Sequence, residues 1–373
     1  MSKNLLTDSP HSIFASKHHS GPRRRTVRDL AAGTLWRLPG RFGIVRTLGS
    51  SYWLRSIVFH DIAEPESPFT RGMGVTITPR SFEVALRFIT SYYNPVSLND
   101  VLDGRTLPPR PVLLTFDDGY ASVMKWAAPL CSRLGVPAIL FLNSSFLDNR
   151  RLAPDNLVCY LCNVMGLDII NSAVRAMMGA DSPRIHSMAD VFSHFFPAIT
   201  RSERQRFLNL LIDMAGIDEA RLAEEAGLYL SRKQIAELAS KGFEIGNHTA
   251  THVRCRSLTA ADMFAEVEGN RAELETVSGK QVRSFSVPYG ATADLTQDVV
   301  LHLKASGHQA VFLSESVANN RTADRFHLDR VSIQADRYDR LFFEVEVLPR
   351  LRALRNRFSR SGRVRMNLAP VER

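Results

Sequence analysis

Two adjacent carboxylates stand where the chain leaves an apolar run, a position that suits catalytic side chains. Asp117 and Asp118 follow residues 112–116 (VLLTF) directly and precede Gly119. Neighbouring residues of a strand point to opposite faces, but a turn at Gly119 can bring both carboxylates to one site. One of them can then bind a metal ion while the other acts as a general base. Taken alone, the same residues are also typical of a simple turn.

Two histidines supply further candidate metal ligands. His248 and His252 belong to the segment HTATH, which follows the apolar run 243–247 (FEIGN). Histidines four residues apart can face the same way on a helical turn and bind one metal through their imidazoles. With Asp118 they form a set of two histidines and one carboxylate, which is the ligand set of a catalytic metal site that keeps a position for water.

A third short segment is VPYG at residues 287–290. Pro288 and Gly290 bracket Tyr289 and predict a rigid turn. Such a turn could present the Tyr289 ring as one wall of a groove that binds a sugar.

The elements that must position these residues alternate between strands and helices. Continuous apolar runs predict strands at 56–60, 112–116, 138–142, 243–247, 283–288 and 309–314, with helical patterns between them. Continuous rather than alternating apolar runs predict a parallel sheet covered on both faces. The fold is therefore α/β, either a barrel or a doubly wound sheet, and in both the chemistry belongs at the carboxyl ends of the strands. Residues 150–230 interrupt the alternation with helical patterns and predict a helical insertion.

Composition and charge exclude several classes of protein. The chain has 373 residues, of which 45% are hydrophobic and 23% charged, as in globular proteins. The net charge of +9 lies at the ends: residues 1–55 hold ten Lys or Arg against two acids, and residues 349–373 hold eight Arg against one Glu. Because the middle is acidic, we expect no nucleic-acid substrate. The four cysteines are too few for a disulfide scaffold.

The motifs TFDDGY, HTATH and VPYG, in this order, resemble those of the polysaccharide deacetylases of the NodB-homology type, carbohydrate esterase family four. The resemblance implies a distorted (β/α) barrel of about seven units, and we place this domain at 56–345 with the insertion at about 150–230. The basic segment 1–55, expected to be partly disordered, and the basic tail 346–373 lie outside the domain.

The resemblance also implies an activity and a set of roles. Such enzymes hydrolyse N-acetyl groups of glycans with one divalent metal, commonly zinc, with cobalt or nickel as alternatives. Asp118, His248 and His252 would be the metal ligands, and Asp117 the general base. The backbone N–H of Tyr120 would help to hold the oxyanion, and Pro288 and Tyr289 would bind substrate. The substrate would be an N-acetylglucosamine polysaccharide or oligosaccharide, such as a chitooligosaccharide or an exopolysaccharide precursor.

The sequence departs from the best-known pattern of this family at two points. The arginine that orients the base in many members would stand two residues before Pro288, where this chain has Ser286, and Arg283 is the nearest arginine. The late segment that usually supplies the catalytic acid is also missing. The pattern is nearer to the branch in which a histidine after the first strand is the acid, which would be His60, with His308 and His327 as weaker candidates.

The sequence also fits two other functions, which are hydrolysis of a non-sugar amide at the same site and glycan binding without catalysis. No signal peptide or membrane-spanning run is evident, so we expect a cytoplasmic protein. The arginines of its ends, interleaved with apolar residues, could lie on an anionic membrane surface. The sequence does not indicate an oligomeric state.

Overall fold

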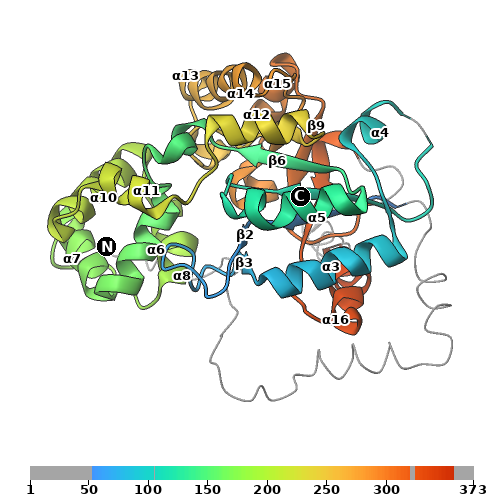
Figure 1. Cartoon of the computed structure of the whole chain (residues 1–373). Coiled ribbons are helices and arrows are strands. Elements are labelled where there is room, and N and C mark those ends of the chain that lie inside the picture. Colours follow the sequence, from blue (N-terminus) through green and yellow to red (C-terminus); the bar gives the residue numbers. More distant parts are fainter. Residues whose placement is uncertain (1–52, 105, 320–323, 357–373) are drawn as a thin grey trace, which may run out of the picture. The chain divides into compact units, whose positions relative to one another are not determined.

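A parallel sheet is the main element of the larger of two compact units in the computed structural model, which describes residues 53–104, 106–319 and 324–356 (Figure 1). Its main path runs, in spatial order, through β11 (Val331–Ser332), β1 (Arg55–Phe59), β5 (Pro111–Phe116), β6 (Ala138–Leu142), β7 (Glu244–Asn247), β8 (Ser284–Ser286), β9 (Ala310–Leu313) and β10 (Leu328–Asp329). The short β4 (Asn94–Pro95) pairs with the start of β5, and β2 (Asp61–Ile62) pairs with β3 (Thr76–Ile77) separately.

One short segment nearly closes this sheet into a barrel. β10 and β11 are separated only by Arg330, yet β10 pairs with β9 while β11 pairs with β1. Residues 328–332 therefore reach from the last strand to the first, and counting them once gives seven strand positions. The expected α/β fold, a distorted (β/α) barrel of about seven units, is confirmed.

The strands alternate between two cores, although every residue of β5 and β6 is buried. Leu113 of β5 and Ile139 and Phe141 of β6 belong to the core inside the barrel. Their neighbours Leu114 and Leu140 pack in the outer core, which the surrounding helices also line. This double burial explains why the runs are continuously apolar, as expected for parallel strands with cover on both faces.

Helices surround the strands of the barrel (Figure 1). They are α3 (Pro79–Tyr92), α4 (Leu98–Leu102), α5 (Ala128–Leu134), α12 (Arg232–Ser240), α13 (Ala260–Met263), α14 (Asn270–Ser278), α15 (Gln297–Ala305) and α16 (Tyr338–Phe342). Helix α11 (Glu219–Ala226) belongs to the same compact unit. Helix α3 begins at Pro79, because the Thr78 side chain accepts the Ser81 N–H and proline suits the first turn.

A second compact unit consists of residues Glu66–Val75 and Pro154–Asp218 among those described. Its helices are α6 (Pro154–Met165), α7 (Leu167–Met178), α8 (Met188–Asp190), α9 (Phe196–Ala198) and α10 (Arg201–Ala215). Phe195, Phe196 and Phe207 pack edge to face in its core. The expected helical insertion is confirmed, whereas the domain boundaries proposed from the sequence stay a prediction.

The basic ends fall largely outside the described residues, which exclude 1–52 and 357–373. Residues 348–356 are helical. The expected membrane contact, the cytoplasmic location and the disorder of the first segment stay predictions. Within the described ranges, no helix is both long enough and apolar enough to cross a bilayer.

Candidate active site

The predicted site residues come from different strands and meet at the carboxyl-terminal edge of the barrel. His60 follows β1, Asp117 and Asp118 follow β5, and His248 follows β7. In a parallel barrel these strand ends lie on one face, where the chemistry of such folds is found. The structure therefore places together residues that are far apart in the sequence.

Asp118, His248 and His252 form one cluster. The Oδ1 atom of Asp118 lies 3.5 Å from the Nε2 atom of each histidine, and the three ligand atoms lie within 4.8 Å of one another. The two imidazole rings are 5.0 Å apart. Burial raises the pKa of Asp118, but the neighbouring histidines more than offset this, so its pKa lies well below the usual value.

The two histidines do not share the helical turn that their spacing suggests. Residues 248–252 form an irregular loop in which Thr249 has φ 61° and His252 has φ 52°. The loop is held from outside, since the Asn143 amide donates to the Thr249 carbonyl at 2.9 Å and the Glu266 carboxylate accepts the Thr251 N–H at 2.9 Å. Left-handed residues and buried partners thus orient the side chains instead of helical periodicity.

The hydrogen bonding of His248 determines which ring nitrogen faces Asp118. Its Nδ1 lies 2.8 Å from the Ser286 carbonyl oxygen, which can only accept, so Nδ1 carries the proton. The Nε2 lone pair then faces the Asp118 carboxylate. This is the arrangement in which a histidine is fixed as a ligand by a partner behind it.

Asp117 is buried and paired with an arginine. Residues 113, 115 and 117 point to the same face of the sheet, so the Asp117 side chain points into the barrel like that of Leu113. The chain then turns at Asp118 and Gly119, which have φ angles of 67° and 72°. Arg330 donates to both Asp117 oxygens at 2.7 Å, and its Nη2 also donates to Ser286 Oγ at 2.8 Å. Burial raises the pKa of Asp117, but Arg330 and the nearby histidines outweigh it and keep the carboxyl ionised.

His60 also reaches this cluster. Its Nε2 lies 4.0 Å from Asp117 Oδ2, and its side chain is 21% exposed. Desolvation lowers the pKa of His60 below its usual value, although the two aspartates oppose this. The other two candidate acids lie elsewhere: His308 contacts Asn247 and Ser306, and His327 lies 4.0 Å from Asp324 in a short 3₁₀ turn (Arg325–His327).

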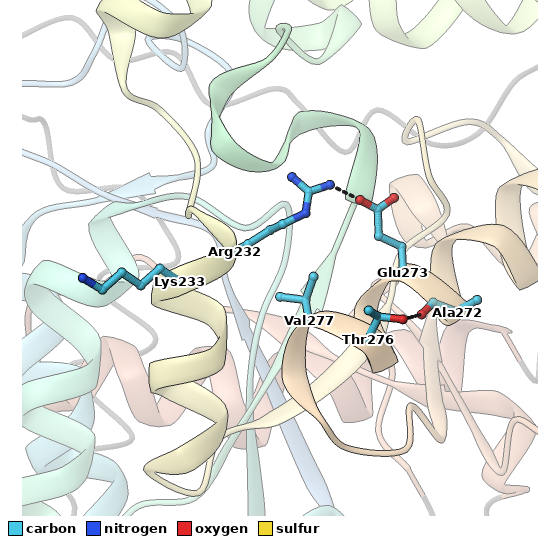
Figure 2. A pocket seen from close by; sticks show the side chains of 6 residues that line it. All are labelled: Arg232, Lys233, Ala272, Glu273, Thr276 and Val277. Atoms are coloured by element: carbon cyan, nitrogen blue, oxygen red, sulfur yellow. Dashed lines mark hydrogen bonds and ion pairs between the residues drawn. The ribbon is translucent and has the colours of Figure 1, made fainter.

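A separate hollow lies between α12 and α14 (Figure 2). It is lined by Arg232, Lys233, Ala272, Glu273, Thr276 and Val277, and Figure 2 shows the ion pair of Arg232 with Glu273 at its edge. None of the cluster residues lines it. The hollow therefore offers no alternative place for the chemistry predicted from the sequence.

A comparison of the sequence with models of protein families shows which family this chain belongs to. Residues 104–311 match the sequence model of the family described as "Polysaccharide deacetylase". The chain belongs to the polysaccharide deacetylase family. The match contains Asp117, Asp118, His248 and His252, and it leaves out His60 and Arg330. A search of curated protein sequences gives no match.

Solved structures agree with this family membership at the level of the fold. The Streptococcus pyogenes deacetylase PplD in complex with acetate shares 13% identity with a TM-score of 0.53, covering 80% of this chain and all of that one. IcaB from Ammonifex degensii shares 19% identity with a TM-score of 0.50, covering 79% of this chain and 98% of that one. The resemblance stated from the motifs and the expectation of a polysaccharide deacetylase are both confirmed. The branch within the family stays a prediction.

The remaining predicted residues of this deacetylase flank the cluster. Tyr120 is buried and its ring stacks on Tyr229 at 6.0 Å, so its backbone rather than its side chain can face the site. Pro288 is buried, and Tyr289 has φ 63°. The Tyr289 ring lies 4.7 Å from the His252 ring, with the Arg254 guanidinium 4.0 Å from its centre. The ring thus contacts both an imidazole and a guanidinium, and its predicted role as a wall of the substrate groove stays a prediction.

Arg330 is a partner of Asp117 that the sequence motifs did not predict. Position 286 lacks the arginine of the best-known pattern, and the Arg330 guanidinium lies against the Ser286 hydroxyl. The available signal was an arginine between Leu328–Asp329 and Val331–Ser332, in a short segment that would otherwise be entirely strand. A fully buried arginine inside a sheet needs an acidic partner.

Proposed function

We propose that this chain is a metal-dependent hydrolase that removes N-acetyl groups from an N-acetylglucosamine polysaccharide or oligosaccharide, such as a chitooligosaccharide or an exopolysaccharide precursor. The observation that carries the proposal is the cluster of Asp118, His248 and His252 beside the Arg330-bound carboxylate of Asp117. Family membership supports a glycan substrate, and an N-acetyl amide is the bond that this arrangement suits.

The donor set fits a divalent transition metal. Two imidazole nitrogens and one carboxylate oxygen match the ligands of catalytic zinc, and cobalt or nickel accept the same donors. The Ser286 carbonyl supports the fit, because it fixes the His248 tautomer that leaves Nε2 available. When bound, such a metal lowers the pKa of a water molecule and polarises the acetamide carbonyl.

Asp117 is the general base of the proposed reaction. Its carboxylate is ionised and can take the proton of the water that attacks the acetamide carbon. Arg330 and the Ser286 hydroxyl fix the carboxylate, and Arg330 also contacts Thr115 Oγ1 at 3.2 Å. Arg330 is a positioning residue, since it is fully buried behind Asp117.

The remaining roles complete the reaction. The Tyr120 backbone N–H helps to hold the developing oxyanion. His60 donates a proton to the departing amine nitrogen, which must leave as a neutral amine for the C–N bond to break. Pro288 and Tyr289 form the part of the substrate site that adjoins His252.

Acetate release tests the proposal directly. Purified protein is stripped with a chelator, reloaded with zinc, cobalt or nickel, and incubated with N-acetylglucosamine oligomers and with small non-sugar amides. We expect acetate from the glycans only after reloading. Acetate from the amides alone would instead favour the same site with a non-sugar substrate, and glycan binding by metal-loaded protein without acetate would favour a binding protein.

A further inference from the structure

Two arginines share one buried carboxylate close to the candidate metal site. Asp294, in the 3₁₀ turn Thr292–Asp294, is fully buried. Arg254 Nη1 lies 2.7 Å from its Oδ2, and Arg256 Nε lies 3.3 Å from its Oδ1. One carboxylate compensates one guanidinium charge, so the group formed by Arg254, Arg256 and Asp294 carries a net positive charge.

This group adjoins the catalytic residues through Tyr289. The Arg254 guanidinium lies over the Tyr289 ring at 4.0 Å, and the Tyr289 ring lies 4.7 Å from the His252 ring. Arg254 is 18% exposed and held by both contacts, so its position is fixed. A ligand group bound here would belong to the reacting sugar or to the sugar next to it.

Arg256 has donors left for a ligand. Its side chain is 41% exposed, and among the described residues its only ion-pair partner is Asp294. A guanidinium has five N–H donors. The 3.3 Å contact with Asp294 Oδ1 is an ion pair without a hydrogen bond, so it satisfies none of them. Glu315, which follows β9, accepts the Thr292 N–H at 2.8 Å and makes no ion pair with either arginine within the described ranges.

We propose that Arg254 and Arg256 form an anion subsite that selects N-acetylated glycans carrying a carboxylate or a phosphate close to the reacting acetamide. The inference rests on the proposed deacetylase function and names its substrate class. Guanidinium groups bind both anions through paired hydrogen bonds, so the geometry accepts either. Asp294 holds the two arginines in place and leaves Arg256 facing solvent.

Matched substrates test the subsite. The carboxylate arm compares an N-acetylheparosan hexasaccharide with its carboxyl-reduced form, and the phosphate arm compares N-acetylglucosamine 1-phosphate with N-acetylglucosamine. We expect kcat/KM to be about three- to tenfold higher for at least one acidic substrate than for its neutral match, and the ratio to fall in 0.5 M salt. R256A should bring the ratio close to one, and R256K, which keeps the charge but loses the paired hydrogen bonds, should keep only part of it.

The control is R87A, because Arg87 is exposed and pairs with Glu83 on the surface of α3. This variant should keep the wild-type ratio. Equal kcat/KM for acidic and neutral substrates in both arms, or an unchanged ratio in R256A, would overturn the subsite while acetate release still supports the deacetylase.

A binding measurement separates the two proposals when turnover fails. Dissociation constants of the same glycans are measured by calorimetry with D117N and with D117N/R256A. Tighter binding of an acidic glycan that disappears in the double variant supports the subsite, whether or not acetate is released. Equal binding by both proteins contradicts it.

Discussion

Arg330 binds both carboxylate oxygens of Asp117 at 2.7 Å across 213 residues of sequence. It can do so because it stands between β10 and β11, in the segment that nearly closes the barrel. The guanidinium also contacts Ser286, the position at which many family members carry the arginine that the resemblance associates with the base. The long side chain of Arg330, from the segment between β10 and β11, and the short side chain of Ser286 thus meet at the Asp117 carboxylate.

Replacing Arg330 by lysine should slow catalysis with little change in substrate binding. Lysine keeps the positive charge but cannot form the two parallel hydrogen bonds, so the base loses its orientation. We expect kcat to fall about a hundredfold, at the lower end of what general-base catalysis contributes, with KM nearly unchanged. The measurement is the steady-state kinetics of acetate release.

The control for R330K is R87K, since Arg87 is exposed and pairs with the exposed Glu83 on the surface of α3. Complete removal in R330A leaves a buried carboxylate unpaired, which costs about 3–5 kcal/mol of stability. The melting temperature of each variant therefore has to be measured, and guanidinium chloride at low concentration should restore part of the activity of folded R330A. A wild-type kcat in R330K would show that Arg330 does not position the base.

Measurements of metal binding should distinguish the roles of Asp117 and Asp118. D118N and H252Q each remove one donor of the three-residue cluster, and we expect metal affinity to fall about a hundredfold or more, because few donors are left. D117N keeps all three donors and should still bind one metal per chain while releasing no acetate. Calorimetry and elemental analysis of the purified variants measure this, and a D117N protein unable to bind metal would show that Asp117 is itself a ligand.

His60 should matter only when the leaving group needs a proton. An amine leaves poorly unless it is protonated, whereas a nitrophenolate leaves without help. We expect H60Q to lose about a hundredfold or more in kcat on the N-acetyl glycan but only a few-fold on 4-nitrophenyl acetate. Equal losses on both substrates would indicate a structural role for His60.

The sequence predicts the barrel and its site edge well, because both depend on local patterns. Continuous apolar runs mark β5 and β6, and polar residues directly after the strands mark Asp117, Asp118 and His248. The resemblance to the family then decides for a barrel over a doubly wound sheet, a choice that the local patterns alone leave open.

Contacts that depend on tertiary structure could not be predicted in the same way. Nothing local relates Arg330 to Asp117, since the relation exists only once residues 328–332 bridge β9 and β1. The helical turn expected for the two histidines fails for a similar reason, because Asn143 and Glu266 hold residues 248–252 in an irregular loop. In both places, the conformation depends on buried polar side chains that come from elements distant in the sequence.

Acid should weaken the fold through His308, which is buried against the residue that precedes His248. Asn247 Nδ2 donates to His308 Nε2 at 3.3 Å, and the other nitrogen, Nδ1, lies 3.0 Å from Ser306 Oγ, so the ring is neutral in this arrangement. A second proton on Nε2 would face the Asn247 amide donor. Burial, assisted by the positive charge of Arg271, lowers the pKa of His308 to about 3.

The sign of the effect follows from this lowered pKa. An exposed histidine has a pKa of about 6.5. Between that pH and about pH 3, His308 binds a proton in the unfolded chain but not in the folded chain, so stability falls as the pH falls. H308Q lacks the group, and we expect the difference in unfolding free energy between wild type and H308Q to shrink by about 2 kcal/mol from pH 7 to pH 5. Urea unfolding of both proteins at the two pH values measures this difference. A constant difference would mean that the His308 ring accepts its second proton in the folded protein, and the Asn247 amide would then have to turn away from it.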